Sequence, residues 1–449
     1  MFNKILIANR GEIAVRVIRA CKEMGIDTIA IYSVPDKDAL HVKMADESVC
    51  IGPAQSQKSY LNTNNILSAA IQKEADAIHP GYGFLSENSE FANMCEEIGL
   101  TFIGPSADSI SKLGKKSLAK KLMHKHGVPV IPGPEESFTE ADKALKEAKK
   151  IGLPVVLKAV SGGGGRGIRI VEDENSFIPI FEEASHEANI SFNDPQLYIE
   201  KFFKNPKHIE IQIIADKHGN CVHLGERDCS TQRRKQKVIE ETPSPVISDE
   251  QRKTIGSKAA KALKQIKYTN AGTVEFLYED GNFFFMEMNT RIQVEHPITE
   301  ITTSTDLVKE QIRVAAGEPL SIKQKDVKWN LHAIECRINA EDPEQNFMPF
   351  AGKIENIIFP SGPGIRVDSG VYPGAQIPPY YDSMVAKVIA FDTNREYAIA
   401  RMIRALNEFE VKGIRTNKHF LLEILFSDGF LNGDYSINFL EKELIKAKI

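Results

Sequence analysis

Short apolar runs and amphipathic helical patterns alternate over the first hundred residues, and this alternation limits the fold more than any other feature. Residues 4–8 (KILIA) and 28–32 (TIAIY) have the pattern of buried strands, and residues 12–24 between them carry apolar side chains at helical spacing. Strand patterns return at residues 75–79 and 100–104. Strands that are separated by helices join in a parallel sheet. We therefore predict an N-terminal α/β domain with a parallel sheet.

Two turns of this domain lie where predicted strands end. Residues 8–11 (ANRG) follow the first strand, and residues 79–83 (HPGYG) follow a later one. Open α/β sheets bind ligands at this edge. No G-x-G-x-x-G sequence opens the first helix, however, which disfavours a dinucleotide-dependent oxidoreductase.

The size and charge of the chain describe an ordinary globular protein with several domains. A chain of 449 residues exceeds the size at which one hydrophobic core stops growing. The net charge is -5, and the densest basic cluster, residues 233–237, is short, so we expect no nucleic-acid partner. No apolar run reaches the roughly 20 residues that span a bilayer, and the N-terminus lacks the apolar core of a signal peptide. We expect a cytoplasmic protein with no membrane partner.

The six cysteines are far apart and form no CxxC pair. This spacing predicts neither a disulfide framework nor a zinc site. Five of them are expected to be small buried hydrophobic residues. We expect Cys229 to lie in a polar loop near the catalytic residues.

Changes in composition predict three domains of mixed α/β and α+β class. A proline-rich segment at 128–134 and a charged helix at 140–150 open a small inserted lid. Residues 208–300 are rich in strand patterns, and the chain after residue 329 has short strands and an amphipathic helix at 395–408. The predicted domains are 1–113, 114–330 with a lid at about 131–203, and 331–449.

A run of four glycines follows a buried strand that ends in Lys158. Ordered glycines lose more backbone entropy than other residues, so residues 161–168 (SGGGGRGI) suit a backbone that must approach a ligand closely or move. Exposed amides beside a lysine would hold phosphate oxygens. The alternative is a flexible surface loop, and the segment is not a Walker motif because no Gly-Lys-Ser/Thr follows.

Two glutamates lie among the aromatic residues of a predicted hairpin. Glu275 and Glu287 would be costly to bury unless a cation neutralised them. A three-residue loop, Asp280 to Asn282, places both on one face, whereas a two-residue loop would separate them. We predict the three-residue loop and a magnesium site that Asn289 completes. The alternative is a pair of solvated carboxylates.

A polar row follows the hairpin. In an extended chain Asn289, Arg291, Gln293 and Glu295 project to one side. Arginine suits the binding of a small planar oxyanion, and a nearby carboxylate can accept a proton from that bound oxyanion. Salt-bridge scaffolding is the alternative.

These segments resemble the biotin carboxylases of the ATP-grasp superfamily over essentially the whole chain. The matching motifs, in order, are IANRGEIA, HPGYGFLSEN, the glycine run, HIEIQ, ERDCS-x-QRR, EMNTRIQVEHPITE, ECRINAEDP and PPYYDSM. The resemblance implies a Rossmann-like pre-ATP-grasp domain, an ATP-grasp domain with a mobile lid, and a C-terminal domain with an antiparallel sheet and helices. It also implies that ATP and bicarbonate form carboxyphosphate, which supplies carbon dioxide to N1′ of biotin.

The resemblance also assigns roles to residues. Nucleotide phosphates or ribose would contact Lys116, Lys158, His208, Gln232 and Lys237, and the adenine hinge would be Glu200, Lys201 and Phe203. The nucleotide would further contact Gly163, Gly164, Gly165 and Leu277. Two ions of magnesium or manganese would be held by Glu275, Glu287 and Asn289. Bicarbonate would be held by Arg291, Gln293 and the backbone of Val294. Glu295 would be the base that deprotonates bicarbonate, and Arg337 would stabilise the biotin enolate. Tyr82 and Arg337 would line the biotin pocket. Lys237 and Arg291 would assist catalysis.

The chain contains one Lys-Met sequence, at Lys43, and its surroundings predict an ordinary helix position rather than a biotin attachment site. The resemblance therefore implies a biotin carboxylase subunit of an acyl-CoA or pyruvate carboxylase, with the biotin carrier and the carboxyltransferase on separate chains. Relatives dimerise, and Arg19, Glu23 and Arg366 are the matching positions for a homodimer.

Two rival functions use the same fold. One is an ATP-grasp ligase that joins a carboxylate to an amine or makes carbamoyl phosphate, and Arg337 in its ECRINAEDP context argues against it. The other is a non-catalytic protein in which ATP sets the conformation. Such a protein would be expected to have lost Glu287, Glu295 or Lys237, and all three are present.

Overall fold

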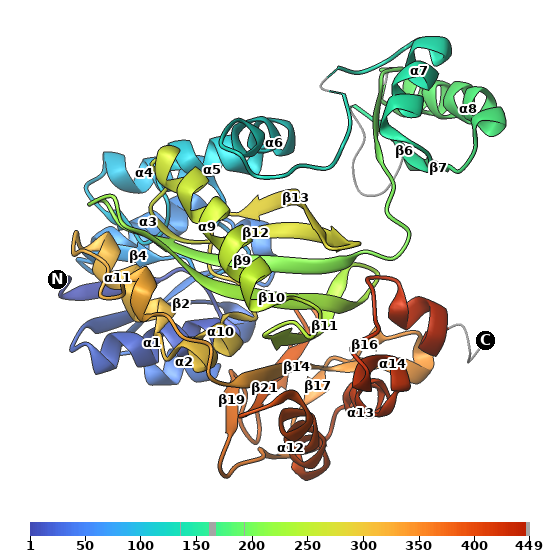
Figure 1. Cartoon of the computed structure of the whole chain (residues 1–449). Coiled ribbons are helices and arrows are strands. Elements are labelled where there is room, and N and C mark those ends of the chain that lie inside the picture. Colours follow the sequence, from blue (N-terminus) through green and yellow to red (C-terminus); the bar gives the residue numbers. More distant parts are fainter. Residues whose placement is uncertain (135, 161–167, 193, 446–449) are drawn as a thin grey trace. The chain divides into compact units, whose positions relative to one another are not determined.

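The computed structural model describes residues 1–134, 136–160, 168–192 and 194–445. The chain separates into two compact units, both drawn in Figure 1. The first contains Met1–Val128, Lys207–Leu277 and Glu287–Ile449, and the second contains Pro129–Pro206 and Tyr278–Met286. The predicted lid falls in the second unit. This division does not test the three domain boundaries, which stay a prediction.

The first unit begins with a five-stranded sheet in the order β3-β2-β1-β4-β5. Its elements are β1 (Lys4–Ile7), α1 (Gly11–Glu23), β2 (Asp27–Ser33), η1 (Val34–Asp36), α2 (Leu40–Met44), β3 (Glu47–Gly52), η2 (Ser56–Lys58), α3 (Thr63–Gln72), β4 (Ala77–His79), α4 (Ser89–Glu97), β5 (Thr101–Phe102), α5 (Ala107–Gly114) and α6 (Lys116–Lys125). All four neighbouring pairs are parallel, which confirms the predicted parallel sheet. Successive side chains of β1 face opposite sides, so Ile5 packs with Ile13 of α1, whereas Leu6 packs with Phe91 of α4.

An eight-stranded sheet has the order β13-β12-β9-β10-β11-β14-β21-β19, and it belongs to the first unit except for Tyr278–Met286 at the tip of the β12–β13 hairpin. Its strands and the neighbouring helices are β9 (Lys207–Ala215), β10 (Cys221–Arg233), β11 (Gln236–Thr242), α9 (Asp249–Gln265), β12 (Asn270–Glu279), β13 (Asn282–Asn289), α10 (His296–Thr303), α11 (Leu307–Ala315), η3 (Gln324–Asp326), β14 (His332–Asn339), β19 (Ile365–Ser369) and β21 (Met384–Asp392). β9 is buried along its whole length. Its side chains alternate, so Glu210 and Gln212 share one face and the isoleucines beside them occupy the other.

Most of the remaining elements of the first unit share one hydrophobic core with β14 and β21. They are β15 (Glu341–Asp342), η4 (Pro343–Gln345), β16 (Met348–Pro349), β17 (Gly352–Lys353), β18 (Asn356–Ile358), β20 (Gln376–Ile377), α12 (Arg395–Glu408), β22 (Glu410–Lys412), α13 (Lys418–Phe426), α14 (Asp428–Leu431) and η5 (Leu440–Ile445). The predicted amphipathic helix at 395–408 is confirmed as α12. Its apolar face, with Met402 and Leu406, belongs to the same core as Val388 of β21.

The second unit is built on a three-stranded antiparallel sheet in the order β7-β6-β8. Its elements are α7 (Ala141–Ile151), β6 (Val155–Ala159), β7 (Ile168–Val171), α8 (Glu174–Phe192) and β8 (Leu197–Lys201). Leu157, Phe177 and Phe181 lie in its core. The predicted phosphate-binding residues Gly163, Gly164 and Gly165 lie outside the described residues.

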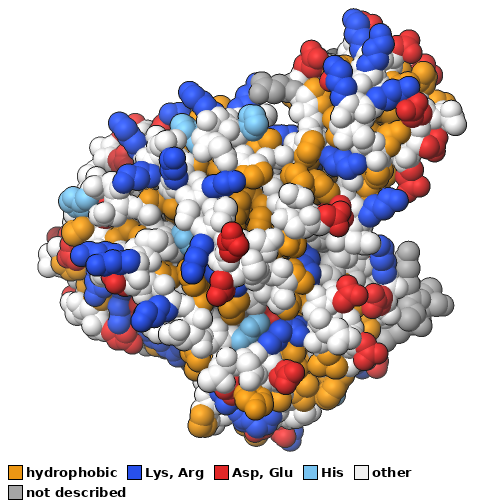
Figure 2. All heavy atoms as spheres, in the orientation of Figure 1, with side chains coloured by type: hydrophobic (Ala, Val, Ile, Leu, Met, Phe, Trp, Pro, Cys, Tyr) orange, Lys and Arg blue, Asp and Glu red, His pale blue; other side chains and the backbone are white. Residues whose placement is uncertain are grey.

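The mixed α/β and α+β class is confirmed by these sheets. In Figure 2 basic and acidic side chains are interspersed over the visible face. None of the helices within the described ranges is both long and apolar enough to cross a membrane.

The hairpin of β12 and β13 corrects one prediction. β12 ends at Glu279 and β13 begins at Asn282, so the loop has two residues, Asp280 and Gly281, and not three. Both have positive φ, 50° and 80°. This combination is the type I′ turn, whose twist matches that of the flanking strands. Glycine and aspartate tolerate such φ values, and this preference decides the loop length.

The shorter turn does not simply move Asn289 away from Glu275. A regular two-residue hairpin would pair Glu275 with Met286 and point Asn289 to the other face. Asn289 Nδ2 nevertheless donates a hydrogen bond of 2.8 Å to Glu275 Oε1. The alternating burial of β13 is interrupted, because Met286 and Glu287 are both half-buried and the next two residues are both buried. The sharing of one cation by Glu275 and Glu287 stays a prediction.

The polar row after β13 is not extended, which is a second correction. Thr290 and Arg291 form a bend, and Val294 and Glu295 form a turn that leads into α10. Glu295, at the N-cap, has φ -82° and ψ 13°. Pro297 favours the first helical turn, so the backbone leaves the strand conformation before it.

Candidate active site

Lys237 of β11 lies at the centre of a buried group of carboxylates. Its Nζ is 2.6 Å from Glu210, 3.1 Å from Glu275 and 2.6 Å from Glu295. The three acids come from β9, from β12 and from the turn before α10. Burial disfavours the charged ammonium, but the three glutamates raise the pKa of Lys237 well above its ordinary value. A charged lysine therefore joins two neighbouring strands of the sheet to the turn before α10.

Glu295 is buried between two cations. Its Oε1 faces Lys237, and its Oε2 accepts a hydrogen bond of 2.9 Å from Arg337 Nη2. Burial opposes ionisation of this carboxyl, yet Lys237, Arg337 and Arg227 hold its pKa well below the ordinary value. Glu295 is therefore a carboxylate and has the charge that a general base needs.

Arg337 of β14 is held by a second acid that sequence reasoning missed. Its Nε donates a hydrogen bond of 2.6 Å to Glu240 of β11, which lies directly across from Glu335. Burial raises the pKa of Glu240 to about 7, although Arg337 opposes this rise. Burial also raises the pKa of Glu335 well above its ordinary value, and neither of its oxygens has a hydrogen-bond partner among the described residues. Burial therefore disfavours the charged form of Glu335, which lies two residues before Arg337 on β14. The pair Glu240-Glu241, directly after the apolar Val238 and Ile239 of β11, was the available signal for Glu240.

Arg291 brings the polar row together despite the bent backbone. Its Nη2 donates to Asn289 at 3.0 Å, and its Nη1 donates to Gln293. Gln293 in turn donates a hydrogen bond of 3.0 Å to Glu275. Arg291 Nε also donates at 2.9 Å to Glu87, a residue of the HPGYGFLSEN motif that received no role from the sequence.

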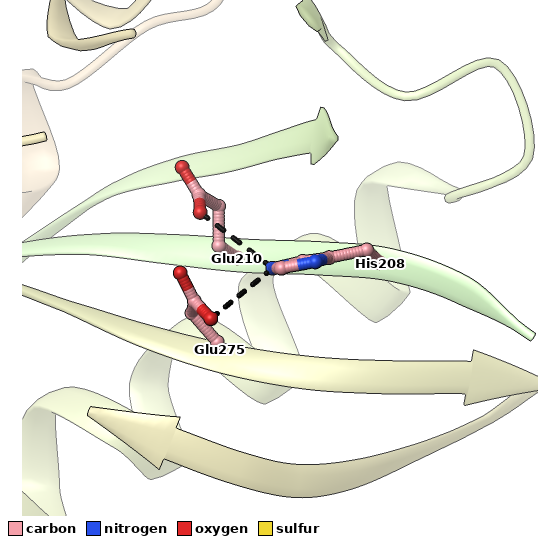
Figure 3. A group of neighbouring side chains, drawn as sticks. All are labelled: His208, Glu210 and Glu275. Atoms are coloured by element: carbon pink, nitrogen blue, oxygen red, sulfur yellow. Dashed lines mark ion pairs between the residues drawn. The ribbon is translucent and has the colours of Figure 1, made fainter. Parts of the chain in front are cut away.

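His208, Glu210 and Glu275 of β9 and β12 form a compact group in which the imidazole ring lies beside both carboxylates (Figure 3). His208 Nε2 lies 3.4 Å from Glu275 and 3.8 Å from Glu210. One ligand atom from each lies within 4.8 Å of the others. Imidazole suits transition metals, whereas magnesium takes oxygen ligands.

The predicted magnesium ligands have the right chemistry for that ion. Glu275 and Glu287 offer carboxylate oxygens, and Asn289 offers an amide oxygen. Burial opposes ionisation of Glu275, but Lys237 and His208 hold its pKa far below the ordinary value. Glu287 is partly exposed, and its Oε2 lies 2.6 Å from the Nζ of Lys116. The residues present therefore fit a divalent cation.

The residues predicted to contact the nucleotide lie in both units. In the second unit Lys158 pairs with Glu200, Lys201 donates to the carbonyl oxygens of Gly152 and Leu153, and the ring of Phe203 lies 4.6 Å from that of Phe284. In the first unit Gln232 Nε2 donates to the Cys229 carbonyl at 3.2 Å, and Leu277 is a half-buried residue of β12. Their nucleotide contacts stay a prediction.

Cys229 lies in strand β10 and not in a loop, which corrects the prediction for this residue. Its side chain is buried, with Sγ 3.8 Å from Glu295 Oε1. Burial raises the pKa of the thiol well above its ordinary value. Cys229 is therefore a neutral thiol, because strand pairing buries a segment whose polar composition indicated a loop.

Two other predicted site residues are held from outside the polar row. The hydroxyl of Tyr82 donates to Glu12 of α1, and the carbonyl of Val294 accepts a hydrogen bond of 2.8 Å from Lys387. The predicted contacts of Tyr82 with biotin and of Val294 with bicarbonate stay predictions.

The three positions predicted to lie in a dimer interface differ in exposure. Arg19 is exposed, and Glu23 lies 2.5 Å from the Nζ of Lys309. Arg366 makes ion pairs with Glu300 and Asp368 at 2.8 and 2.7 Å. These contacts lie within one chain, so a role in dimerisation stays a prediction.

Comparison with known proteins accounts for almost the whole chain. The biotin carboxylase N-terminal domain matches residues 1–110, the ATP-binding domain of the carbamoyl-phosphate synthase L chain matches residues 115–323, and the biotin carboxylase C-terminal domain matches residues 335–442. Biotin carboxylase 1 of Bacillus subtilis is 55% identical over 98% of both chains. The biotin carboxylase of Haemophilus influenzae is 54% identical over 99% of both chains.

A solved structure agrees with these relatives. The biotin carboxylase domain dimer of 2-oxoglutarate carboxylase from Hydrogenobacter thermophilus, in complex with magnesium ADP, ADP and bicarbonate, is 50% identical, covers 98% of both chains and has a TM-score of 0.89. The site geometry, the ordered domain matches and the identity over the full length agree, and the chain belongs to the biotin carboxylase family of ATP-dependent ligases.

Proposed function

We propose that this protein carboxylates N1′ of biotin with ATP and bicarbonate, through carboxyphosphate. The observation that carries this proposal is the position of Glu295. It is an ionised carboxylate between Lys237 and Arg337, and it follows directly on the polar row that Arg291 gathers. A base beside a site for a small oxyanion is what deprotonation of bicarbonate requires.

In the proposed first step bicarbonate binds to Arg291, Gln293 and the Val294 backbone. Glu295 accepts the bicarbonate proton, the bicarbonate oxygen attacks the γ-phosphate of ATP, and the bond from that phosphate to ADP breaks, so that carboxyphosphate and ADP form. Bound magnesium would be held by Glu275, Glu287 and Asn289, and would neutralise negative charge on the phosphates. Lys116, Lys158, His208 and Gln232 would contact the nucleotide.

Lys237 links nucleotide binding to the strength of the base. The lysine is shared by three carboxylates, so a phosphate that attracts its ammonium group competes with Glu295. Partial withdrawal of that cation raises the pKa of Glu295 and makes it a better proton acceptor. The base would thus gain strength when the phosphates arrive.

In the second half of the reaction carboxyphosphate breaks into carbon dioxide and phosphate, the phosphate accepts the proton of biotin N1′, and this nitrogen attacks the carbon dioxide. Arg337 is placed to stabilise the negative charge that develops on the ureido oxygen. One such donor contributes about 3 kcal/mol to the transition state. Tyr82 would line the biotin pocket.

We further propose that biotin arrives on a separate carrier protein and that a carboxyltransferase on another chain consumes carboxybiotin. We also propose that this chain works as a homodimer in the cytoplasm, where ATP is available. Lys43 of the Lys-Met sequence lies inside helix α2, with its Nζ against the ring of Tyr372. A lysine that carries biotin must swing between active sites, and a lysine of a short helix whose Nζ is held by Tyr372 does not suit that role. The dimer in the Hydrogenobacter structure supports the homodimer.

The test is ATP hydrolysis by the purified protein with magnesium, bicarbonate and free biotin. We expect hydrolysis to require all of these components. Glu295→Gln should abolish it while nucleotide binding persists, and Glu250→Gln, a change to an exposed glutamate of α9, should leave it unchanged. Hydrolysis that depended instead on ammonia or an amino acid would favour the rival ATP-grasp ligase.

A further inference from the structure

Lys387 is a fully buried lysine of β21 that received no role from the sequence. Its Nζ lies 2.8 Å from the carbonyl oxygen of Val294, 3.0 Å from Glu12 Oε1 and 3.9 Å from Asp368. Burial disfavours the ammonium form, but Glu12, Glu335 and Asp368 raise the pKa of Lys387 above its ordinary value. A buried charge is expensive, and this one is compensated by partners from three elements.

The position of Lys387 relative to Arg337 indicates what it does. The two residues lie directly opposite each other on the antiparallel strands β14 and β21, so their side chains share one face of the sheet. Like charges in such a pair repel. They are separated by their partners: Arg337 binds the side chain of Glu295, and Lys387 binds the carbonyl of the preceding residue, Val294.

The hydrogen bonds from Arg337 and Lys387 together fix the proposed base, Glu295, at two points. The Val294 carbonyl belongs to the peptide unit that contains the Glu295 nitrogen, so a hydrogen bond to that carbonyl restricts rotation of the peptide. The hydrogen bond from Arg337 then restricts the side chain. Val294 and Glu295 lie outside the described strands, and the ammonium group of Lys387 holds the Val294 carbonyl through a hydrogen bond of 2.8 Å.

Lys387 also connects this turn to the biotin side of the proposed site. Glu12, its carboxylate partner, accepts a hydrogen bond from the hydroxyl of Tyr82. The second oxygen of Glu12 is buried and has no hydrogen-bond partner among the described residues. The chain of contacts runs from Tyr82 through Glu12 and Lys387 to the Val294 carbonyl.

We propose that Lys387 is a positioning residue that fixes the Val294–Glu295 peptide and, through Glu12, holds Tyr82 at a fixed position relative to that peptide. This inference rests on the proposed function, because it assigns Lys387 a part in placing the base and the biotin pocket of the same site. Lys387 does not touch the reacting atoms.

The main experiment is Lys387→Met, which keeps the length of the side chain and removes its charge and donors. We expect kcat/KM for bicarbonate to fall by about 100-fold, the size of the effect when a catalytic group is displaced by about 1 Å. ATP affinity, measured by nucleotide binding without turnover, should stay at the wild-type value. All rates are to be expressed per mole of folded protein.

Arg252→Met is the matched control. Arg252 is a buried cation of α9 that pairs with Glu226 at 2.6 Å, and its described contacts lie outside the catalytic group. The Arg252→Met substitution should lower thermal stability and leave kcat/KM for bicarbonate, expressed per mole of folded enzyme, unchanged. If Lys387→Met also lowers only stability, or if both variants lose kcat/KM equally, the lysine is structural and the proposal is overturned.

Glu12→Gln is the second variant and serves if Lys387→Met does not fold. It keeps the shape of the side chain and removes the anionic partner of Lys387. A selective loss of kcat/KM for bicarbonate supports the proposal, and unchanged kinetics overturn it. In the double variant the losses should be less than multiplicative, because both changes break one chain of contacts.

The failure of this inference differs from the failure of the proposed function. An inactive wild-type protein in the presence of bicarbonate and biotin would overturn both. An active wild-type protein with wild-type kinetics in Lys387→Met and Glu12→Gln would overturn the role of Lys387 alone.

Discussion

Arg337 Nη2 lies 2.9 Å from Glu295 Oε2, although the two residues come from β14 and from the turn before α10. The guanidinium thus contacts the proposed base directly and also the acid Glu240. The residue proposed for the biotin step therefore helps to set the charge of the residue proposed for the bicarbonate step.

Arg337→Met is expected to slow turnover by about 10²–10³-fold with little change in ATP affinity, since one oxyanion donor has an effect of this size. The pKa of Glu295 should rise when one of its cations is removed. Glu295 must be ionised to accept a proton, so the acidic limb of the kcat/KM profile should move to higher pH. Steady-state kinetics across pH check both effects. Arg404→Met, on the exposed side of α12, is the control, and an unshifted acidic limb would contradict the pairing.

Glu87→Gln is expected to raise the KM for bicarbonate several-fold. Glu87 accepts a hydrogen bond of 2.9 Å from Arg291, and a charge-assisted hydrogen bond at a partly exposed site contributes about 1 kcal/mol. The ATP requirement should not change. Glu90→Gln, at an exposed position of the neighbouring helix α4, is the matched control. An equal rise in KM for bicarbonate and for ATP would argue against a specific effect on Arg291.

Removal of magnesium with a chelator should stop ATP hydrolysis, and magnesium or manganese should restore it. Glu287→Gln is expected to raise the magnesium concentration for half-maximal activity by about tenfold or more, because a carboxylate ligand becomes a neutral amide. The change also deprives Lys116 of its partner at 2.6 Å. Lys116→Met, measured in parallel, separates the loss of that ion pair from the loss of a ligand. If both variants need the same extra magnesium, Glu287 is not a ligand.

The stability of the protein should fall as the pH drops from 7 toward 4, partly because of His41. Burial lowers the pKa of His41 to about 4, with Asp36 opposing and Arg10 adding to this effect. Below pH 6.5 the unfolded chain binds a proton at this residue and the folded chain does not. The contribution to stability is therefore complete above that pH and is lost as the pH falls toward 4, on the order of 3 kcal/mol.

His41→Gln should reduce this loss, as measured by urea unfolding at pH 7 and pH 4.5. His419→Gln, at an exposed position of α13, should leave the pH dependence unchanged. The same pH dependence in His41→Gln and in the wild type would show that other groups account for the acid sensitivity.

Local sequence patterns predicted much of the fold because those patterns act within single elements. The apolar spacing of residues 395–408 predicted α12 with the same bounds, and the buried runs near Ile5 and Ile29 predicted parallel strands. The hairpin turn was predicted wrongly. There the φ preferences of Asp280 and Gly281 were decisive, and not the need to place two acids on one face.

The site was harder to predict because its contacts join distant residues. Motifs implied that Lys237 and Glu295 belong to the site. The ion pairs of Lys237 with three carboxylates, however, depend on the pairing of β9 with β10 and of β10 with β11. Glu87 and Arg291 are more than 200 positions apart, and nothing near Glu87 indicates its partner. Only the fold brings such pairs together.

The second compact unit is not made from one stretch of chain, since Tyr278–Met286 joins Pro129–Pro206 within it. The backbone nitrogen of Phe285 donates to the carbonyl of Pro129, and the ring of Phe284 lies against that of Phe203. During synthesis the ribosome must therefore deliver the tip of the later hairpin before this unit can be completed. Until then the ring of Phe203 lacks its contact with Phe284, so the earlier segment cannot complete its packing before the later hairpin is made.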